Sequence, residues 1–187
     1  IIMANLKEIR SRISSVGSTM QITSAMKMVS AAKLKRAQDA ITQMRPYSNK
    51  LTELLENLSA NLDSSSTGKY SEKRDLKKIL FVTISSNRGL CGGFNANIIK
   101  KTKDLIKSEY PKCSPYILSI GKKTSEHFTK NNFDVIKKSD ELFSNLTYDN
   151  VKDIAEFIMS AFVDKKFDKV ILVYNRFKNA ATQVIMS

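Results

Sequence analysis

The first sixty residues carry a hydrophobic pattern that predicts one very long helix. Between Leu6 and Leu58, apolar residues recur at alternating spacings of three and four, with a proline only at Pro46 and a glycine only at Gly17. A 3,4 repeat kept over so many turns gives a narrow apolar stripe, which is typical of a coiled coil. About fifty residues at roughly 1.5 Å per residue make a rod of about 80 Å. That is longer than any domain the remaining residues could build. We therefore expect the rod to project and its stripe to need another helix as cover.

The stripe is interrupted in one place. At heptad spacing it runs through Leu6, Ile9, Ile13, Val16, Met20, Thr23, Lys27, Ser30, Leu34, Ala37, Ile41, Met44, Ser48, Leu51, Leu55 and Leu58. Its polar members are Thr23, Lys27, Ser30 and Ser48, and the first three fall within the stretch QITSAMKMVSAAKLKR, residues 21–36. Because the stripe resumes in the same register after Pro46, we expect a kink there and not the end of the helix.

The rest of the chain predicts a linker and an α/β domain. Residues 61–77 are polar, rich in serine and charge and without periodicity, which favours a flexible linker. From Lys78 onward, short apolar runs alternate with helical segments. We expect strands at 78–86, 114–121, 133–139, 168–177 and 181–187, and helices at 93–109, 122–131 and 150–166. This alternation predicts right-handed crossovers and a mostly parallel sheet.

The predicted fold class is therefore α/β, with a long N-terminal coiled-coil helix at 4–60 and a Rossmann-like, mostly parallel α/β domain at 78–187. The last apolar strand runs to Ser187, and no partner helix for the rod lies in the chain. We therefore expect the domain to be truncated at its C-terminal end.

Composition points to a globular protein with an acidic partner. The apolar fraction is 42% and the formal net charge is +13, so the surface should attract nucleic acid, an anionic membrane or an acidic protein face. Nucleic acid is disfavoured, because the lysines spread around the helix and no aromatic residue lies within 21–36. No window approaches the roughly 18 consecutive apolar residues of a membrane span.

The sequence offers little material for catalysis or metal binding. Cys91 and Cys113 are too few for a disulfide framework or a zinc site, and His127 is the only histidine. No carboxylate pair stands alone in an apolar context, so we expect no catalytic residue, no metal site and no cofactor.

A glycine-rich loop follows the first predicted strand. The segment SSNRGLCGGFN, residues 85–95, lies where a Rossmann sheet binds phosphate. However, Gly89, Gly92 and Gly93 do not match the G-x-G-x-x-G spacing, and the next strand ends at Gly121 without an acidic residue. Glycines that permit positive φ or close approach of another chain are the stronger interpretation. A nucleotide-binding α/β domain with a coiled-coil arm stays open as the alternative function.

Three features occur together in this chain. They are the basic helix that begins ANLKEIRSRISSVGSTMQITSAMKMVSAAKLKRAQ, the polar linker, and the domain with SSNRGLCGGFNANIIK after its first strand. Together they closely resemble the gamma subunit of F-type ATP synthase. The resemblance covers residues 4–187. It implies a non-catalytic central stalk whose N-terminal helix pairs with a C-terminal helix of the same subunit, and that helix is missing here. The implied partners are the alpha and beta subunits, the epsilon subunit and the membrane c-ring. The implied location is peripheral, on the cytoplasmic face of a bacterial inner membrane or the mitochondrial matrix side, through the complex alone.

The candidate site residues follow from this resemblance and from charge and flexibility. We expect partner contacts from Met26, Lys27, Met28, Lys33, Lys35, Arg36, Arg88, Gly89, Cys91, Gly92, Gly93 and Lys100. The resemblance implies an acidic loop of the beta subunit as the partner of the basic residues. Methionines suit a changing partner, and Lys27 must extend its charge out of the seam along its own stem. The alternatives are a locally loosened coiled coil without external contact and, for Arg88 and Lys100, a solvated surface.

Overall fold

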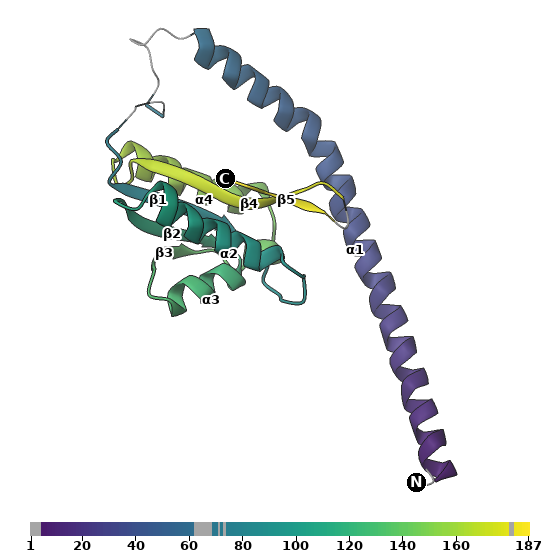
Figure 1. Ribbon diagram of the computed structural model, residues 1–187. Coiled ribbons are helices and arrows are strands. Elements are labelled where there is room, and N and C mark those ends of the chain that lie inside the picture. The colour runs from purple at the N-terminus through teal and green to yellow at the C-terminus, as the bar shows by residue number, and fades with distance from the viewer. Residues whose placement is uncertain (1–4, 62–68, 71, 73, 180–181) are drawn as a thin grey trace. The chain divides into compact units, whose positions relative to one another are not determined.

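The computed structural model describes residues 5–61, 69, 70, 72, 74–179 and 182–187. The chain divides into two compact units, Ile1–Ser66 and Thr67–Ser187, and each is described by itself. The described part of the first unit is essentially one helix, α1, Leu6–Asn61, of 56 residues. Figure 1 shows α1 as one continuous ribbon whose axis bends toward its C-terminal end. Pro46 lies inside it, so the prediction that the helix continues past the proline is confirmed.

The apolar seam of α1 is exposed along its whole length. Its large apolar members range from 38% exposed at Ile41 to 69% at Leu6. Among the described residues of this helix none is buried, and only Gly17 and Gln38 are partly buried. Helix stability normally comes from burying such a stripe, so α1 has a face that needs a partner.

The second unit is built on a five-stranded sheet in the order β3-β2-β1-β4-β5. Its strands are β1 Lys78–Ile84, β2 Ser114–Ile120, β3 Asp134–Lys138, β4 Lys169–Phe177 and β5 Gln183–Met186. The first four are parallel and β5 is antiparallel to β4. The predicted mostly parallel α/β fold is confirmed, with β5 as an antiparallel edge that follows β4 without an intervening helix.

Helices cover both faces of this sheet. They are α2 Phe94–Asp104, which continues as the π-helical turn η1 Leu105–Glu109, α3 Lys122–Lys130 and α4 Tyr148–Val163; a 3-10 turn, η2 Leu142–Ser144, precedes α4. On one face, Ile79 and Phe81 of β1 pack against Ile98 of α2 and Phe128 of α3. On the other, Leu80 and Val82 pack against α4. β1 is buried on both sides because it is the central strand.

The residues just before β1 are tied to the domain. The Asp168 carboxylate accepts hydrogen bonds from the backbone N–H groups of Lys77 at 2.9 Å and Lys78 at 2.7 Å. These two bonds lower the pKa of Asp168, because they favour its charged form. Arg74 donates to the carbonyl oxygen of Phe162 in the last turn of α4. Both Arg74 and Lys77 fall within the range predicted as linker, most of which lies outside the described residues.

Candidate partner-binding surfaces

The candidate residues of the helix are all exposed side chains of α1. They are Met26, Lys27, Met28, Lys33, Lys35 and Arg36. At about 100° per residue, they do not share one face. Met26 and Lys33 lie on one flank of the seam position Lys27, Met28 and Lys35 lie on its other flank, and Arg36 lies opposite. The pattern therefore places one methionine and one lysine on each side of the seam.

This part of the helix is strongly and uniformly basic. Residues 21–36 contain Lys27, Lys33, Lys35 and Arg36 and no carboxylate. Lys35 forms an exposed ion pair with Asp39 at 3.0 Å, which is worth little in water. The surface of α1 can thus attract an acidic partner from several directions around the axis.

The polar seam position Thr23 is already satisfied within the helix. Its hydroxyl donates to the carbonyl of Thr19 at 2.8 Å, and the hydroxyl of Thr19 donates to Ser15 at 2.9 Å. Such bonds to the preceding turn leave no side-chain donor seeking a partner. A shallow hollow of 490 Å³ runs here along Val16, Thr19, Met20, Thr23, Ser24 and Lys27. Thr19 and Thr23 can therefore face a close neighbour here without an unpaired hydroxyl.

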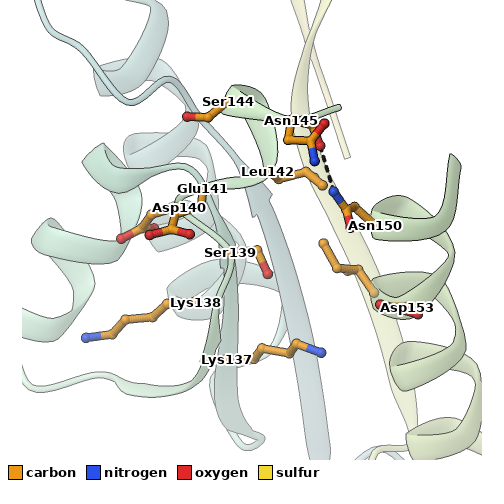
Figure 2. A pocket seen from close by; sticks show the side chains of 11 residues that line it. Lys137, Lys138, Ser139, Asp140, Glu141, Leu142, Ser144, Asn145, Asn150 and Asp153 are labelled. Carbon is orange, nitrogen blue, oxygen red and sulfur yellow. Dashed lines mark hydrogen bonds between the residues drawn. The ribbon is translucent and has the colours of Figure 1, made fainter. Parts of the chain in front are cut away.

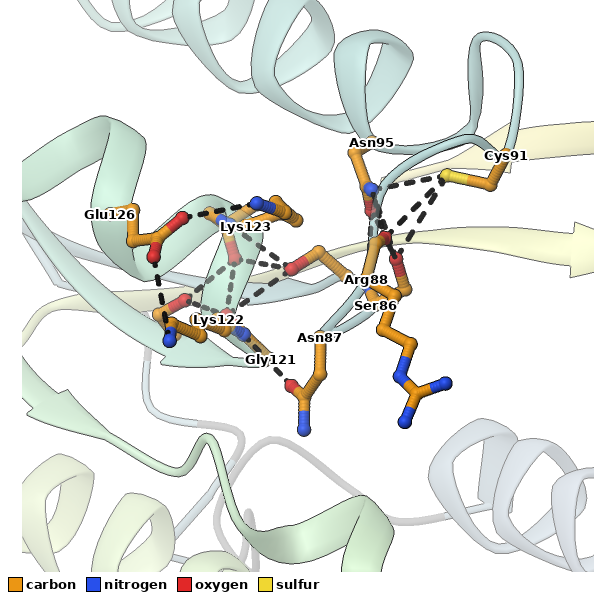
Figure 3. Close-up of polar contacts among 12 residues, drawn as sticks. Ser86, Asn87, Arg88, Cys91, Asn95, Gly121, Lys122, Lys123 and Glu126 are labelled. Atoms are coloured by element: carbon orange, nitrogen blue, oxygen red, sulfur yellow. Dashed lines mark hydrogen bonds and ion pairs between the residues drawn. The ribbon is translucent and has the colours of Figure 1, made fainter.

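The loop after β1 is held in shape by Asn95, which sequence reasoning did not single out. The amide oxygen of Asn95 accepts from the backbone N–H of Ser86 at 3.0 Å. Its amide nitrogen donates to Ser86 Oγ at 2.9 Å, to the Arg88 carbonyl at 3.3 Å and to Cys91 Sγ at 3.1 Å. Figure 3 shows this network on one side of the loop and the Arg88 guanidinium pointing away from it. One side chain in the first turn of α2 therefore fixes the loop.

Leu90 at the tip of this loop is the second residue that sequence reasoning missed. The residue is fully exposed, and its φ is +60°. An L-residue with a branched side chain in the left-handed region is held there at a cost of about 1 to 2 kcal/mol. Gly92, at φ +58°, adopts the same region without that cost. Only the positive φ and the full exposure identify Leu90, and neither can be seen in the sequence.

The remaining loop candidates lie together, whereas Lys100 does not. Arg88, Gly89, Cys91 and Gly92 form the exposed loop and Gly93 is the N-cap residue of α2. Lys100 is an exposed residue further along α2. The loop thus exposes a cation and an apolar residue two positions apart, Arg88 and Leu90, which is chemistry suited to a protein partner.

The backbone N–H groups at the start of α3, the helix that follows β2, are already bonded within the protein. The backbone N–H of Lys122 donates to the Asn87 side chain at 2.9 Å, that of Lys123 to the Ser86 carbonyl at 3.2 Å and that of Thr124 to Ser85 Oγ at 3.1 Å. A phosphate needs such N–H groups free. The occupied groups at α3 give no support to nucleotide binding at this position.

Another hollow of 770 Å³ lies where β3 ends and α4 begins (Figure 2). Its lining carries both signs of charge, including Lys137, Lys138, Asp140, Glu141 and Asp153. The Asn150 amide donates to the Asn145 carbonyl at 2.8 Å across one end. Charges of both signs in an open hollow do not select one class of ligand, so we assign none.

The described residues show no group of three or more potential metal ligands. His127 lies on α3, where burial and then the nearby charge of Lys103 lower its pKa and favour the neutral ring. Within the same residues, no helix combines the length and the apolar character needed to cross a membrane.

Comparison with known proteins gives the family. The sequence model of the ATP synthase family matches residues 5–187. The chain is 56% identical over 183 residues to the ATP synthase gamma chain of Christiangramia forsetii, covering 98% of this chain and 64% of the relative. The chain belongs to the ATP synthase gamma-chain family. It is also 54% identical over 185 residues to the gamma chain of Flavobacterium psychrophilum, covering 99% of this chain and 64% of that relative.

A solved structure agrees with this family assignment. The chain is similar to a chain of the Tetrahymena thermophila mitochondrial ATP synthase central stalk and c-ring, with a TM-score of 0.65 and 26% identity over 88% of this chain and 70% of that one. The resemblance expected from the sequence is thus confirmed. The gamma-family chain described here spans about 64% of the length of the curated relatives it matches.

Proposed function

We propose that this gamma-family chain is the N-terminal part of the central rotor of an F-type ATP synthase. The rotor couples ion movement through a membrane ring to ATP synthesis or hydrolysis in a hexamer of alpha and beta subunits. The chain itself supplies no catalytic group. The observation that carries this proposal is the continuous 56-residue helix with its apolar seam exposed. A rod of about 80 Å whose stripe needs a second helix has the form of half of a shaft.

The second helix is proposed to come from the same subunit. Its apolar face would cover the seam of α1, and coiled-coil packing of two helices would stiffen the rod enough to transmit torque. Near Lys27 the cover is interrupted, because the polar seam positions contribute little apolar contact there. We propose that this segment also contacts the surrounding alpha and beta subunits.

The basic side chains set the chemistry of those contacts. Lys27, Lys33, Lys35 and Arg36 on α1 would face carboxylates of the surrounding ring, with Met26 and Met28 providing adaptable apolar contact. On the domain, Arg88 and Leu90 present a cation beside an apolar tip, held by Asn95, and Lys100 adds positive charge on α2. We propose an acidic loop of the beta subunit as the partner of these basic groups. Leu90 would then enter an apolar depression beside the acidic groups.

The domain is proposed to lie at the foot of the shaft, against the epsilon subunit and the c-ring. The complex would hold the chain at the cytoplasmic face of a bacterial inner membrane, or the matrix side in a mitochondrion. Support for this placement comes from the family and from the similarity to a central-stalk structure.

Charge reversal in the reconstituted complex tests the proposal. Lys27→Glu, Arg36→Glu and Arg88→Glu should each weaken coupling, seen as slower or interrupted ATP-driven rotation in single-molecule recordings. Lys130→Glu on the exposed end of α3 is the matched control and should rotate normally. Rotation that is unchanged in all three variants, with the subunit incorporated normally, would contradict the proposed contacts. Failure of the wild-type full-length subunit to copurify with alpha and beta chains would contradict the rotor function itself.

A further inference from the structure

One segment of the α/β domain has the opposite charge to the rest of this basic chain. Residues 139–153, SDELFSNLTYDNVKD, run from the end of β3 through η2 into α4. They contain one lysine and four carboxylates, which give a formal charge of −3 in a chain of +13. The carboxylates are those of Asp140, Glu141, Asp149 and Asp153. Among the described residues none of these four forms an ion pair, so their charges are available to a partner.

The same segment exposes large apolar side chains. They are Phe143, Leu146, Tyr148 and Val151, and their exposed fractions run from 43% at Val151 to 80% at Tyr148. Tyr148 and Val151 are three residues apart on α4, so they lie on one side of the helix. Four such residues within nine positions form a patch of the kind that marks an interaction surface. These four side chains and the four carboxylates make up the η2–α4 surface.

Hydrogen bonds within the segment hold this surface in shape. The backbone N–H of Ser144 donates to the Glu141 carbonyl at 2.9 Å, and that of Thr147 donates to the Asn145 carbonyl at 3.1 Å. The Thr147 hydroxyl caps α4 by accepting from the N–H of Asn150 at 3.4 Å. The Asn150 amide donates to the Asn145 carbonyl at 2.8 Å. The apolar side chains are therefore exposed on an ordered backbone, which lowers the entropy lost when a partner binds.

Asp140 adds a group that lacks a partner. Among the described residues, its Oδ1 is the one buried side-chain oxygen or nitrogen without a hydrogen bond. Leaving such an oxygen unpaired is costly. Asp140 lines the hollow of Figure 2, whose mixed charges select no ligand by themselves. Lys137 is turned toward α4, where its Nζ lies 4.4 Å from the centre of the Phe157 ring. A cation that satisfies Asp140 therefore has to come from outside.

The combination of charge and apolar exposure decides the class of partner. Four carboxylates would repel an anionic membrane or a nucleic acid, both of which attract basic residues. A metal ion would leave the apolar side chains uncovered. A protein segment with apolar side chains between lysines or arginines would cover the apolar residues and pair with the carboxylates around them.

We propose that the η2–α4 surface binds a segment of another protein chain whose apolar side chains are flanked by lysine or arginine. The apolar residues form the centre of the contact, the exposed carboxylates form its rim, and one cation reaches Asp140. The proposed contacts of α1 and Arg88 need an acidic partner, so this surface needs a different one. The inference rests on the charge and exposure of 139–153 and not on the proposed rotor function.

Photo-cross-linking in the full-length subunit, within its assembled complex in native membranes, tests this inference. A benzophenone amino acid replaces Tyr148, and mass spectrometry identifies the attached peptide. The same probe at Thr129, which is exposed on α3, is the control site. With the probe at position 148, Glu141→Lys and Asp153→Lys are combined to reverse two exposed rim charges. Lys152→Glu, on the same segment, is the matched control because it keeps the surface acidic.

The proposal expects attachment at position 148 to a peptide in which lysine or arginine flanks apolar residues. The double reversal should lower the yield about tenfold or more, and Lys152→Glu should keep it. Exposed substitutions of this kind should leave the thermal unfolding midpoint of the purified subunit nearly unchanged, so a lost yield reports on binding. Attachment no stronger than at Thr129, attachment to lipid or to an acidic peptide, or a yield that ignores the charge reversal would overturn the proposal. Attachment only to a second copy of the subunit would also overturn it.

Discussion

Removing the Arg74 side chain should destabilise the α/β domain by about 3 kcal/mol. Arg74 is only 10% exposed in its side chain. It donates to the carbonyl oxygens of Phe162 at 2.6 Å and Phe167 at 3.3 Å, and its guanidinium lies 4.3 Å from the centre of the Phe162 ring. These groups surround the end of α4, where helix carbonyls lack partners within the helix.

The magnitude follows from these contacts. A hydrogen bond from a charged donor contributes about 1.5 to 3 kcal/mol, and a partly desolvated cation–π contact about 1 kcal/mol more. The second hydrogen bond is long, and water can reach some of the carbonyls after truncation, so the total for Arg74→Ala is about 3 kcal/mol. The ion pair with Glu72 adds no appreciable amount, because the Glu72 carboxylate is exposed and both solvent and salt screen it.

Urea unfolding followed by near-ultraviolet circular dichroism checks this prediction, because tyrosines such as Tyr116, packed on Phe167, report on the domain. Arg74→Ala should lower the unfolding midpoint without changing the slope. Arg74→Lys keeps the charge but loses the planar fork and should fall between wild type and alanine. Lys166→Ala, which removes an exposed cation near the same helix end, is the control. A loss below about 0.5 kcal/mol for Arg74→Ala would refute the view that this side chain ties the segment before β1 to α4.

Three further predictions concern single positions. Hydrogen bonds lower the pKa of Asp168 in the folded protein, so as the pH falls Asp168 is protonated first in the unfolded state. The charged Asp168 therefore stabilises the fold above its unfolded pKa of about 3.9, and this stabilisation is lost as the pH falls from there through the folded pKa. Asp168→Asn should thus be less stable than wild type at pH 7, with the gap in denaturation midpoint closing toward pH 2. Gly121→Ala should cost about 3 kcal/mol or more by urea unfolding, because φ is +106° and a Cβ would lie 2.3 Å from the Ser85 carbonyl oxygen. Gly17→Ala, where the added Cβ meets nothing within 4 Å beyond its chain neighbours and the backbone of its own helix, should instead raise the helix content seen by far-ultraviolet circular dichroism. A Gly121→Ala variant as stable as wild type, or a Gly17→Ala variant with less helix than wild type, would contradict the reasoning. Asn95→Ala should speed amide exchange in residues 86–91 by about tenfold, and unchanged exchange would show that Asn95 does not hold the loop.

Most of the elements could be predicted because their patterns are local. The 3,4 spacing from Leu6 onward predicted α1, and its unbroken register across Pro46 predicted that the helix continues. The apolar runs KILFV and VILVY predicted central strands. Most of β1 is buried, and Ile171 and Val173 of β4 are buried. The antiparallel direction of β5 was within reach of the sequence, because the five residues between Phe177 and Gln183 are too few for the crossover that a parallel neighbour needs.

The candidate surfaces were predicted less completely. The resemblance named the loop 88–93 and the basic residues of α1, and these stay proposals. Leu90 was missed because its exposure depends on a left-handed backbone conformation, which the residue pattern does not predict. Asn95 was missed because its hydrogen bonds join a helix to a loop several residues away, and such bonds exist only once both elements are in place.

The sequence by itself determined the length of α1, the position of its seam and the family, because spacing and motif are properties of neighbouring residues. Only the tertiary structure decided which groups meet: Arg74 on the end of α4 and Asp168 on the start of β1. Those contacts join residues far apart in the chain, and their geometry follows from how the sheet orders its strands.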